Sequence, residues 1–179
     1  MQIDTPPKFA SQVFPVTIDA TSFRQVMRKF ATGVTVLTVR DAERLHGMTA
    51  NAFASVSLSP TLVLVCILKG STTHDFVSRA GSFAMNILSA DQEHLAMRFA
   101  KQTAAPADPF ADIAQHSVAT GAPIFDDCVA YVDCRVVAAH DAGDHTIFVG
   151  EVQAADFGSA RDRPPLLWLD GKYETFPNR

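Results

Sequence analysis

Short runs of β-branched and apolar residues recur along the chain and are typical of β-strands. They predict strands over residues 33–39, 48–57, 61–68, 82–88, 128–140 and 145–155. Pro60 ends the second of these runs and the third follows almost at once, which favours antiparallel neighbours. A turn is expected over residues 43–47, a second at Gly143, and a tight hairpin at Asp170–Gly171.

A different spacing of apolar residues predicts three helices. Phe23, Val26, Met27 and Phe30 follow the i, i+3, i+4, i+7 pattern of an amphipathic helix that begins after Asp19. Residues 69–81 indicate a short helix with Phe76, Val77 and Ala80 facing inward. Ser89 and Gln92 form a capping box before a helix that carries Leu95, Ala96 and Phe99. Residues 101–123 lack periodicity and indicate a long loop, which in a compact domain is often functional.

Many strands, few helices and short connections favour a mainly β protein, a closed antiparallel barrel with helices packed outside. The chain has 179 residues, of which 47% are hydrophobic, and this suits one compact domain. We expect that domain to span residues 19–179, after a flexible N-terminal arm over residues 1–18.

Charge and cysteine content narrow the class of protein. The net charge of −4 gives no general reason to expect nucleic acid or an anionic membrane as a partner. The longest apolar run, residues 62–68, is too short to span a bilayer, and no signal peptide is visible. Cys66, Cys128 and Cys134 form neither a disulfide framework nor a zinc set, and Cys66 is expected to be a small buried hydrophobe. A cytoplasmic protein without a metal is the simplest interpretation.

Small, nearly uncharged hydrogen-bonding residues gather in two stretches, residues 32–35 and 47–57. Glycine lets a ligand approach the backbone, whose N–H groups bind phosphate or ring carbonyls. Such a lining suits a flat, electron-poor heterocycle with a phosphate tail, although the pattern alone favours a strand pair with a polar outer face. The chain has no GxGxxG and no GxxxxGK[ST] motif, so neither Rossmann nor P-loop chemistry is supported.

Two further places carry groups that can bind an anion. Lys69, Ser71, Thr72 and Thr73 open a helix, where free N–H groups favour an anion, although most such caps bind nothing. Arg98 can reach a second phosphate or complement the dipole of its helix. Among the histidines, those at 74, 94 and 116 are expected at the surface, and His46 in a turn beside Gly47.

The segment HDAGDHTIFVGEV, residues 140–152, places His145 where a turn becomes a strand, with Asp141 and Asp144 just before it. A hairpin needs only the glycine and one aspartate, so the histidine is a candidate for another role. The alternative is a turn histidine that is hydrogen-bonded to Asp141 or Asp144.

Five segments together resemble the short-chain flavin reductases, the reductase partners of two-component flavin-dependent monooxygenases. These segments are FRQVMRKFATGVTVLTV, GMTANAFASVSLSPTLVLVC, SFAMNIL, GDHTIFVGEV and PLLWLDGKY, and they span about residues 23–176 in order and at familiar spacings. The resemblance implies a split β-barrel homodimer that binds FMN or FAD and oxidises NADH or NADPH. It further implies that hydride passes from the nicotinamide to the flavin, which then leaves for a partner monooxygenase.

The resemblance also implies roles for particular residues. His145 lies beside the nicotinamide and positions it, and Tyr173 closes over the nicotinamide. The backbone N–H groups of residues 48–51 face the ring edge that becomes negative on reduction. The residues implied to line the flavin are Thr32, Gly33, Val34, Thr35, Met48, Thr49, Ala50, Asn51, Ser55, Val56 and Ser57. Those implied to hold the ribityl phosphate or its extension are Cys66, Lys69, Ser71, Arg98, Phe99 and Ala100.

The chain departs from the family pattern at one position near its end. Many relatives carry Arg-Gly-Arg-Tyr after an aromatic residue, whereas here Asp170 stands in place of the first base, two residues after Trp168. An acid there puts a pyridine-nucleotide phosphate contact in doubt and favours NADH over NADPH.

Two other functions fit the same sequence. One is a flavoprotein of this fold that holds its flavin tightly and reduces another acceptor. The other is a non-catalytic flavin-binding module without a nicotinamide site. His145 and Tyr173 favour catalysis over binding alone.

Overall fold

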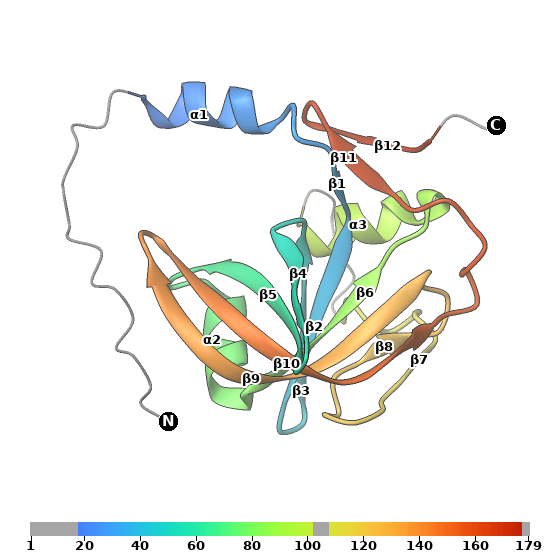
Figure 1. Ribbon diagram of the computed structural model, residues 1–179. Coiled ribbons are helices and arrows are strands. Elements are labelled where there is room, and N and C mark those ends of the chain that lie inside the picture. Colours follow the sequence, from blue (N-terminus) through green and yellow to red (C-terminus); the bar gives the residue numbers. More distant parts are fainter. Residues whose placement is uncertain (1–17, 102–107, 177–179) are drawn as a thin grey trace.

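The computed structural model describes residues 18–101 and 108–176, so the predicted N-terminal arm lies almost wholly outside the described residues. A seven-stranded antiparallel sheet in the order β3-β2-β6-β9-β10-β5-β4 forms the body of the molecule (Figure 1). Its strands are β2 (Thr35–Asp41), β3 (Arg44–Ala50), β4 (Phe53–Leu58), β5 (Thr61–Leu68), β6 (Ser82–Ile87), β9 (Ala130–Ala142) and β10 (His145–Phe157).

The sheet curls like a barrel, but its hydrogen-bond ladder stays open between the edge strands β3 and β4. These two strands follow each other along the chain through Asn51 and Ala52, and no strand pairing among the described residues joins them. Register shifts at Val149/Gly150 and at Ser55/Ser57 bend the strands. The expected closed barrel was therefore wrong in its closure, whereas the mainly β split barrel is confirmed.

Two small sheets lie beside the body. The first has the order β1-β11-β12 and consists of Thr32–Gly33, Leu167–Leu169 and Lys172–Glu174. The second pairs β7 (Gln115–His116) with β8 (Ile124–Phe125), within and after the expected long loop. In the first small sheet Thr32 pairs with Trp168, so residues far apart in the chain meet at one place.

Three α-helices were expected and all three form: α1 (Ala20–Met27), α2 (Thr72–Ala80) and α3 (Glu93–Phe99). Asp19 caps α1, and Gly81 ends α2 in the left-handed conformation. The capping box of Ser89 and Gln92 is present, with a 3₁₀ turn (η1, Ala90–Gln92) between it and α3. No helix within the described ranges is long and apolar enough to cross a membrane.

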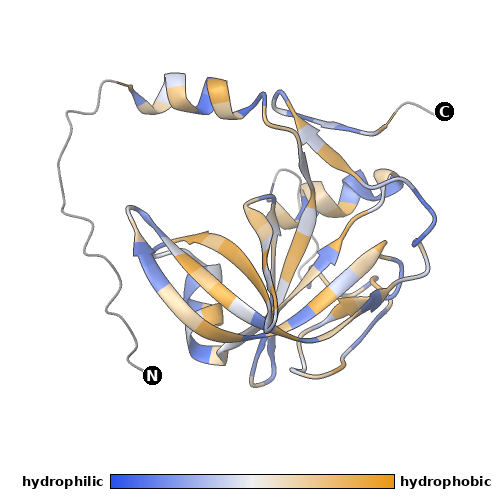
Figure 2. Ribbon diagram, viewed as in Figure 1, coloured by the Kyte–Doolittle hydropathy of each residue, from blue (hydrophilic) through white to orange (hydrophobic). Residues whose placement is uncertain are grey.

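The core consists of two clusters of buried side chains. One packs Leu95, Ala96 and Phe99 of α3 against β1–β2, β8 and Leu166. The other packs Phe76 and Val77 of α2 against β2, β5, β6 and β10. Figure 2 shows hydrophobic residues alternating with polar ones along the strands of the body. The inward faces expected for α2 and α3 are therefore confirmed.

Several local expectations were wrong. The first hairpin turns at Ala42–Glu43 and not over residues 43–47, since Asp41 pairs with Arg44. The expected strand over residues 48–57 is two strands with a break at residues 51–52. Cys66 is only partly buried, because it alternates with the buried Val65 and Ile67 and faces the other side of the sheet.

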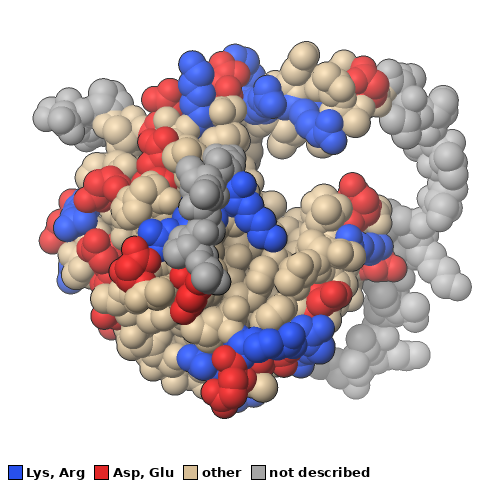
Figure 3. Space-filling model, turned by 180° about the vertical axis from the view of Figure 1, so that it is seen from behind, with Lys and Arg blue, Asp and Glu red and all other residues tan. Residues whose placement is uncertain are grey.

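The first helix differs from the other two in its packing. None of its residues is buried, and the apolar face formed by Phe23, Val26, Met27 and Phe30 is 46–66% exposed. Figure 3 shows open space between α1 and the barrel. An ion pair of 2.6 Å between Lys29 Nζ and Asp170 Oδ2 ties the end of this helix to the β11–β12 hairpin.

Candidate functional site

A series of adjoining cavities runs from β1 past β3 to the ends of α2 and α3. The first has a volume of about 270 Å³ and the second about 200 Å³, and Asn51 lines both. The third has a volume of about 320 Å³ and shares Thr49 and Ala100 with the second. The three together form an elongated hollow, with β3, an edge strand of the sheet, along it.

The first cavity is lined by the apolar residues Phe30, Phe53 and Ile87 and by small residues of β1 and β2. Thr32, Gly33 and Thr35 line it, and a methyl group added at Gly33 would meet no atom within 4 Å. The Asn51 amide donates from Nδ2 to Thr32 Oγ1 at 3.2 Å. Thr35 turns its hydroxyl inward and donates to the Ala50 carbonyl at 2.7 Å, so this hydroxyl joins β2 to β3.

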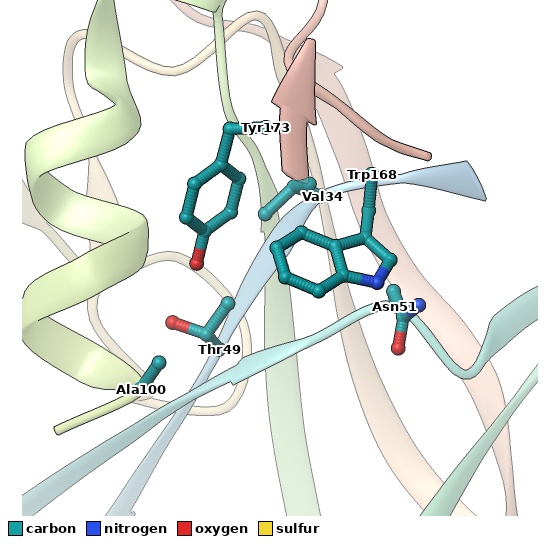
Figure 4. Close-up of a pocket in the computed structure, with 6 residues that line it drawn as sticks. All are labelled: Val34, Thr49, Asn51, Ala100, Trp168 and Tyr173. Atoms are coloured by element: carbon teal, nitrogen blue, oxygen red, sulfur yellow. The ribbon is translucent and has the colours of Figure 1, made fainter. Parts of the chain in front are cut away.

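The second cavity has an aromatic wall (Figure 4). Trp168 and Tyr173 contact each other edge to face, with ring centroids 4.9 Å apart and planes at 65°. Both are half-buried and pack against the α3 core cluster. Burial raises the pKa of the Tyr173 hydroxyl, which therefore keeps its proton at neutral pH. Opposite, Thr49 donates to the Ala96 carbonyl at 2.6 Å and fixes β3 against α3.

The third cavity carries a cation and several hydroxyl side chains. Met48, Ser71, Phe99 and Lys101 are among its lining residues. His46 lies in β3 and not in a turn as expected; its Nε2 is 2.8 Å from Thr73 Oγ1, and its ring stacks on Phe76. Burial, followed by the charge of Lys101, lowers the pKa of His46, so its imidazole is neutral at pH 7.

Arg98 lies at this end too but is already engaged. Its guanidinium makes two bonds to the Asp112 carboxylate, at 2.6 and 3.1 Å, and this pair lowers the pKa of Asp112. It lines a neighbouring cavity with Lys101 and Phe99. Arg98 therefore reaches the end of the hollow as half of an ion pair.

His145 begins β10, beside the two-residue turn Gly143–Asp144. Its Nδ1 is 2.7 Å from Asp144 Oδ1, which is the contact expected of a turn histidine. Its side chain is 41% exposed, and it lines none of the three cavities described above. Lys69 lies beside the same turn and donates to the Gly143 carbonyl at 2.9 Å.

The other candidate residues separate into two groups. The structure brings most of the 32–35, 48–51 and 98–100 stretches together around the hollow, with Ser71 and Tyr173. It leaves Ser55, Val56 and Ser57 on β4, Cys66 on β5 and the buried Ala50 outside the cavities. His74, expected at the surface, is half-buried, with Nε2 2.9 Å from Thr146 Oγ1.

Several lining residues were not among the sequence candidates for cofactor binding. They are Trp168, His46 and Lys101 and, in the first cavity, Phe30, Ala31, Phe53 and Ile87. An apolar strand residue such as Trp168 gives no local sign of a ligand site. The one available sign was its place in the same segment as Tyr173, five residues away.

Comparison with known proteins places the chain among flavin-reducing enzymes. Residues 27–177 match the family model described as a flavin reductase like domain. The chain is 44% identical over 155 residues to the FMN reductase (NADH) SmoA of Agrobacterium fabrum, covering 87% of this chain and 85% of that protein. It is 35% identical over 156 residues to the flavin-dependent monooxygenase reductase subunit HsaB of Mycobacterium tuberculosis, covering 87% and 82%.

A solved structure gives the same result for the fold. The Streptomyces globisporus NADH:FAD oxidoreductase SgcE6 superposes with a TM-score of 0.82 at 38% identity, covering 97% of this chain and 100% of that chain.

Proposed function

This chain belongs to the flavin reductase-like family, and on that premise we propose that it is an NADH-dependent flavin reductase. Bound together, NADH supplies a hydride and FMN or FAD accepts it, so the cofactors carry the chemistry. The reduced flavin then serves a partner monooxygenase, a role supported by the HsaB relative, which is named the reductase subunit of a flavin-dependent monooxygenase.

The single observation that carries this proposal is the shape and chemistry of the hollow. Its β1 end is uncharged and combines small polar groups with apolar side chains, its middle has an aromatic wall, and its far end carries Lys101. An elongated ligand with a flat ring and a phosphate tail fits this order of groups. Residues of the first two cavities would hold the ring, and Lys101 with Ser71 would hold the phosphate.

The protein's own contribution is alignment and electrostatics. As an edge strand, β3 turns the N–H of every other residue away from its ladder with β2, and these groups are free to donate to a ring edge. The bond from Thr49 to Ala96 and the bond from Thr35 to Ala50 hold that strand in place. Donors fixed before the ligand arrives stabilise negative charge that grows on the ring during reduction.

We propose that His145 positions the nicotinamide and is not an obligatory proton donor. The His145→Ala variant should lose about tenfold in kcat/KM for NADH, equivalent to about 1.4 kcal/mol, with flavin affinity nearly unchanged. Asp144→Ala is the matched control, because it removes the contact of His145 at 2.7 Å but keeps the imidazole. Equal losses of flavin and NADH affinity in His145→Ala would show a structural role instead.

We infer that two copies of the chain associate. The exposed apolar face of α1 supports this, since an isolated helix of eight residues with no buried side chain gains little from folding alone. A second copy that covers Phe23, Val26 and Met27 supplies the missing burial. Light scattering should give twice the chain mass, and a monomer at micromolar concentration contradicts the inference.

All three cysteines are free thiols, which supports a location in the reducing cytoplasm.

The direct test mixes purified protein with NADH and either FMN or FAD and follows the loss of nicotinamide absorbance. With free flavin, we expect the protein to oxidise NADH over many turnovers, so that the nicotinamide absorbance falls. Flavin binding without NADH oxidation would instead identify a binding module. Slow turnover with free flavin and rapid turnover with another acceptor would identify a flavoprotein that keeps its flavin.

A further inference from the structure

Trp168 and Asn51 stand on the same side of the second cavity, and together they present a hydrogen-bond donor and an acceptor. Figure 4 shows the indole nitrogen of Trp168 on the side of the pocket where the Asn51 amide lies. Trp168 is the only tryptophan of the chain. Among the described residues its indole N–H donates to no protein group and Asn51 Oδ1 accepts from none, although both residues line the cavity.

The two side chains are fixed relative to each other through Thr32. The Thr32 hydroxyl accepts from Asn51 Nδ2 at 3.2 Å, which turns the amide so that Oδ1 is its remaining acceptor. The backbone of Thr32 pairs with that of Trp168 in the small sheet. The contact of the indole with the Tyr173 ring limits its rotation. The donor and the acceptor are thus held in place without a ligand.

A donor next to an acceptor is the complement of a planar amide edge, in which a C=O stands beside an N–H. We propose that Asn51 and Trp168 bind such an edge of the reacting ring, with the indole N–H donating to the carbonyl and Asn51 Oδ1 accepting from the N–H. This makes Trp168 a specificity-determining residue, and it rests on the proposed function. Both the carboxamide of the nicotinamide and the pyrimidine part of the flavin ring present a C=O beside an N–H.

Ligand analogues separate the two sources without any mutation. Isothermal titration of the wild-type protein compares FMN with its N3-methyl analogue, and NAD⁺ with the analogue that carries an acetyl group in place of the carboxamide. Each analogue lacks the N–H. One lost hydrogen bond costs about 1 to 1.5 kcal/mol, which corresponds to a weakening of about five- to tenfold. The analogue that is weakened identifies the ring, and unchanged affinity for both overturns the proposal.

Two variants test the pair itself. Trp168→Phe keeps an aromatic ring against Tyr173 and removes only the N–H, and Asn51→Ala removes the acceptor. Each should weaken the same ligand about five- to tenfold and leave the other ligand within about twofold. In Asn51→Ala the analogue and its parent should bind equally, because the group that distinguishes them has gone; this double-mutant cycle isolates the contact.

Leu169→Ala is the matched control for disturbance of the hairpin. Leu169 pairs with Lys172 one step along the same hairpin and is 36% exposed, and it lines none of the cavities. It should bind both ligands as the wild type does. Trp168→Phe affinities equal to the wild type, in a protein that still oxidises NADH, overturn the proposal and leave the flavin reductase function standing. Failure of the wild type to oxidise NADH contradicts that function instead.

Discussion

The two glycine–aspartate hairpins of this chain are alike in construction and different in use. The β9–β10 hairpin turns through Gly143–Asp144 with Gly143 at a φ of 64°, and the β11–β12 hairpin turns through Asp170–Gly171 with φ angles of 56° and 80°. Each is a two-residue turn with glycine where a positive φ is needed. In each the acid has a partner, His145 in one and Lys29 in the other.

What differs is where the neighbouring side chains lie. Beside the first turn His145 is exposed and contacts Asp144, whereas beside the second turn Trp168 and Tyr173 line a cavity and pack on the core. The first hairpin carries the residue type that suggests chemistry, and the second carries the residues that form the pocket wall. The type of a residue can suggest a chemical role, but only the packed structure shows which side chains lie together in one site.

The largest expected difference between the hairpins is in stability. Trp168→Ala should lower the free energy of unfolding by about 2 to 3 kcal/mol, because it removes a half-buried ring and its contact with Tyr173. His145→Ala should change it by less than about 0.5 kcal/mol, since that side chain is exposed. Urea unfolding measures both values. Equal losses would mean that the two hairpins are equally integrated in the core.

Replacing either turn glycine by alanine should lower the stability by the same amount, but only one of the two replacements should weaken ligand binding. Gly171→Ala and Gly143→Ala each place a side chain at positive φ, which costs about 1 to 2 kcal/mol. A Cβ meets no atom within 4 Å at Gly143 and only the Arg28 side chain, at 3.6 Å, at Gly171, so the cost is conformational. Only Gly171→Ala should also weaken FMN, because its hairpin carries the pocket wall. Weaker FMN binding in Gly143→Ala would remove this distinction.

The smallest effect concerns the two acids. A hydrogen bond from His145 lowers the pKa of Asp144, and one from Lys29 lowers the pKa of Asp170. A lowered carboxyl pKa in the folded state stabilises the protein above the ordinary value of about 3.8, and this is lost as the pH falls through the lowered pKa. Carboxyl NMR titration should show that the pKa of Asp144 rises in His145→Ala and that the pKa of Asp170 rises in Lys29→Ala. Each variant should leave the other acid unchanged, and a common shift would contradict these local causes.

Local sequence patterns predicted most of the helices and strands but not which of them contact each other. β-branched runs located the strands, Asp19 located the start of α1, and Ser89 located the 3₁₀ turn that leads into α3. The turn at Ala42–Glu43 was missed, because neither residue has turn chemistry and the more polar 43–47 stretch drew the prediction. His46 was misplaced for the same reason.

The residues alone indicated the site only as separate stretches, and the family resemblance joined residues 98–100 and Tyr173 to them. The 32–35 and 48–51 stretches were candidates because small hydrogen-bonding residues gather in them, and the β2–β3 hairpin brings the two stretches together. Trp168 was missed because its partner, Thr32, lies 136 residues earlier, and no local pattern reports such a pairing. Ser55, Val56, Ser57 and Cys66 were expected in the site but lie outside these cavities, although Phe53 at the start of β4 lines the first one.

The pairing of Thr32 with Trp168 also has a consequence for how the protein matures in a cell. A ribosome that adds about 5 to 20 residues per second needs roughly 7 to 27 s to travel from one to the other. During that interval the emerging polypeptide contains Thr32 but lacks the aromatic wall of the second cavity. The ability to accept a cofactor is therefore acquired only after the β11–β12 hairpin has been synthesised.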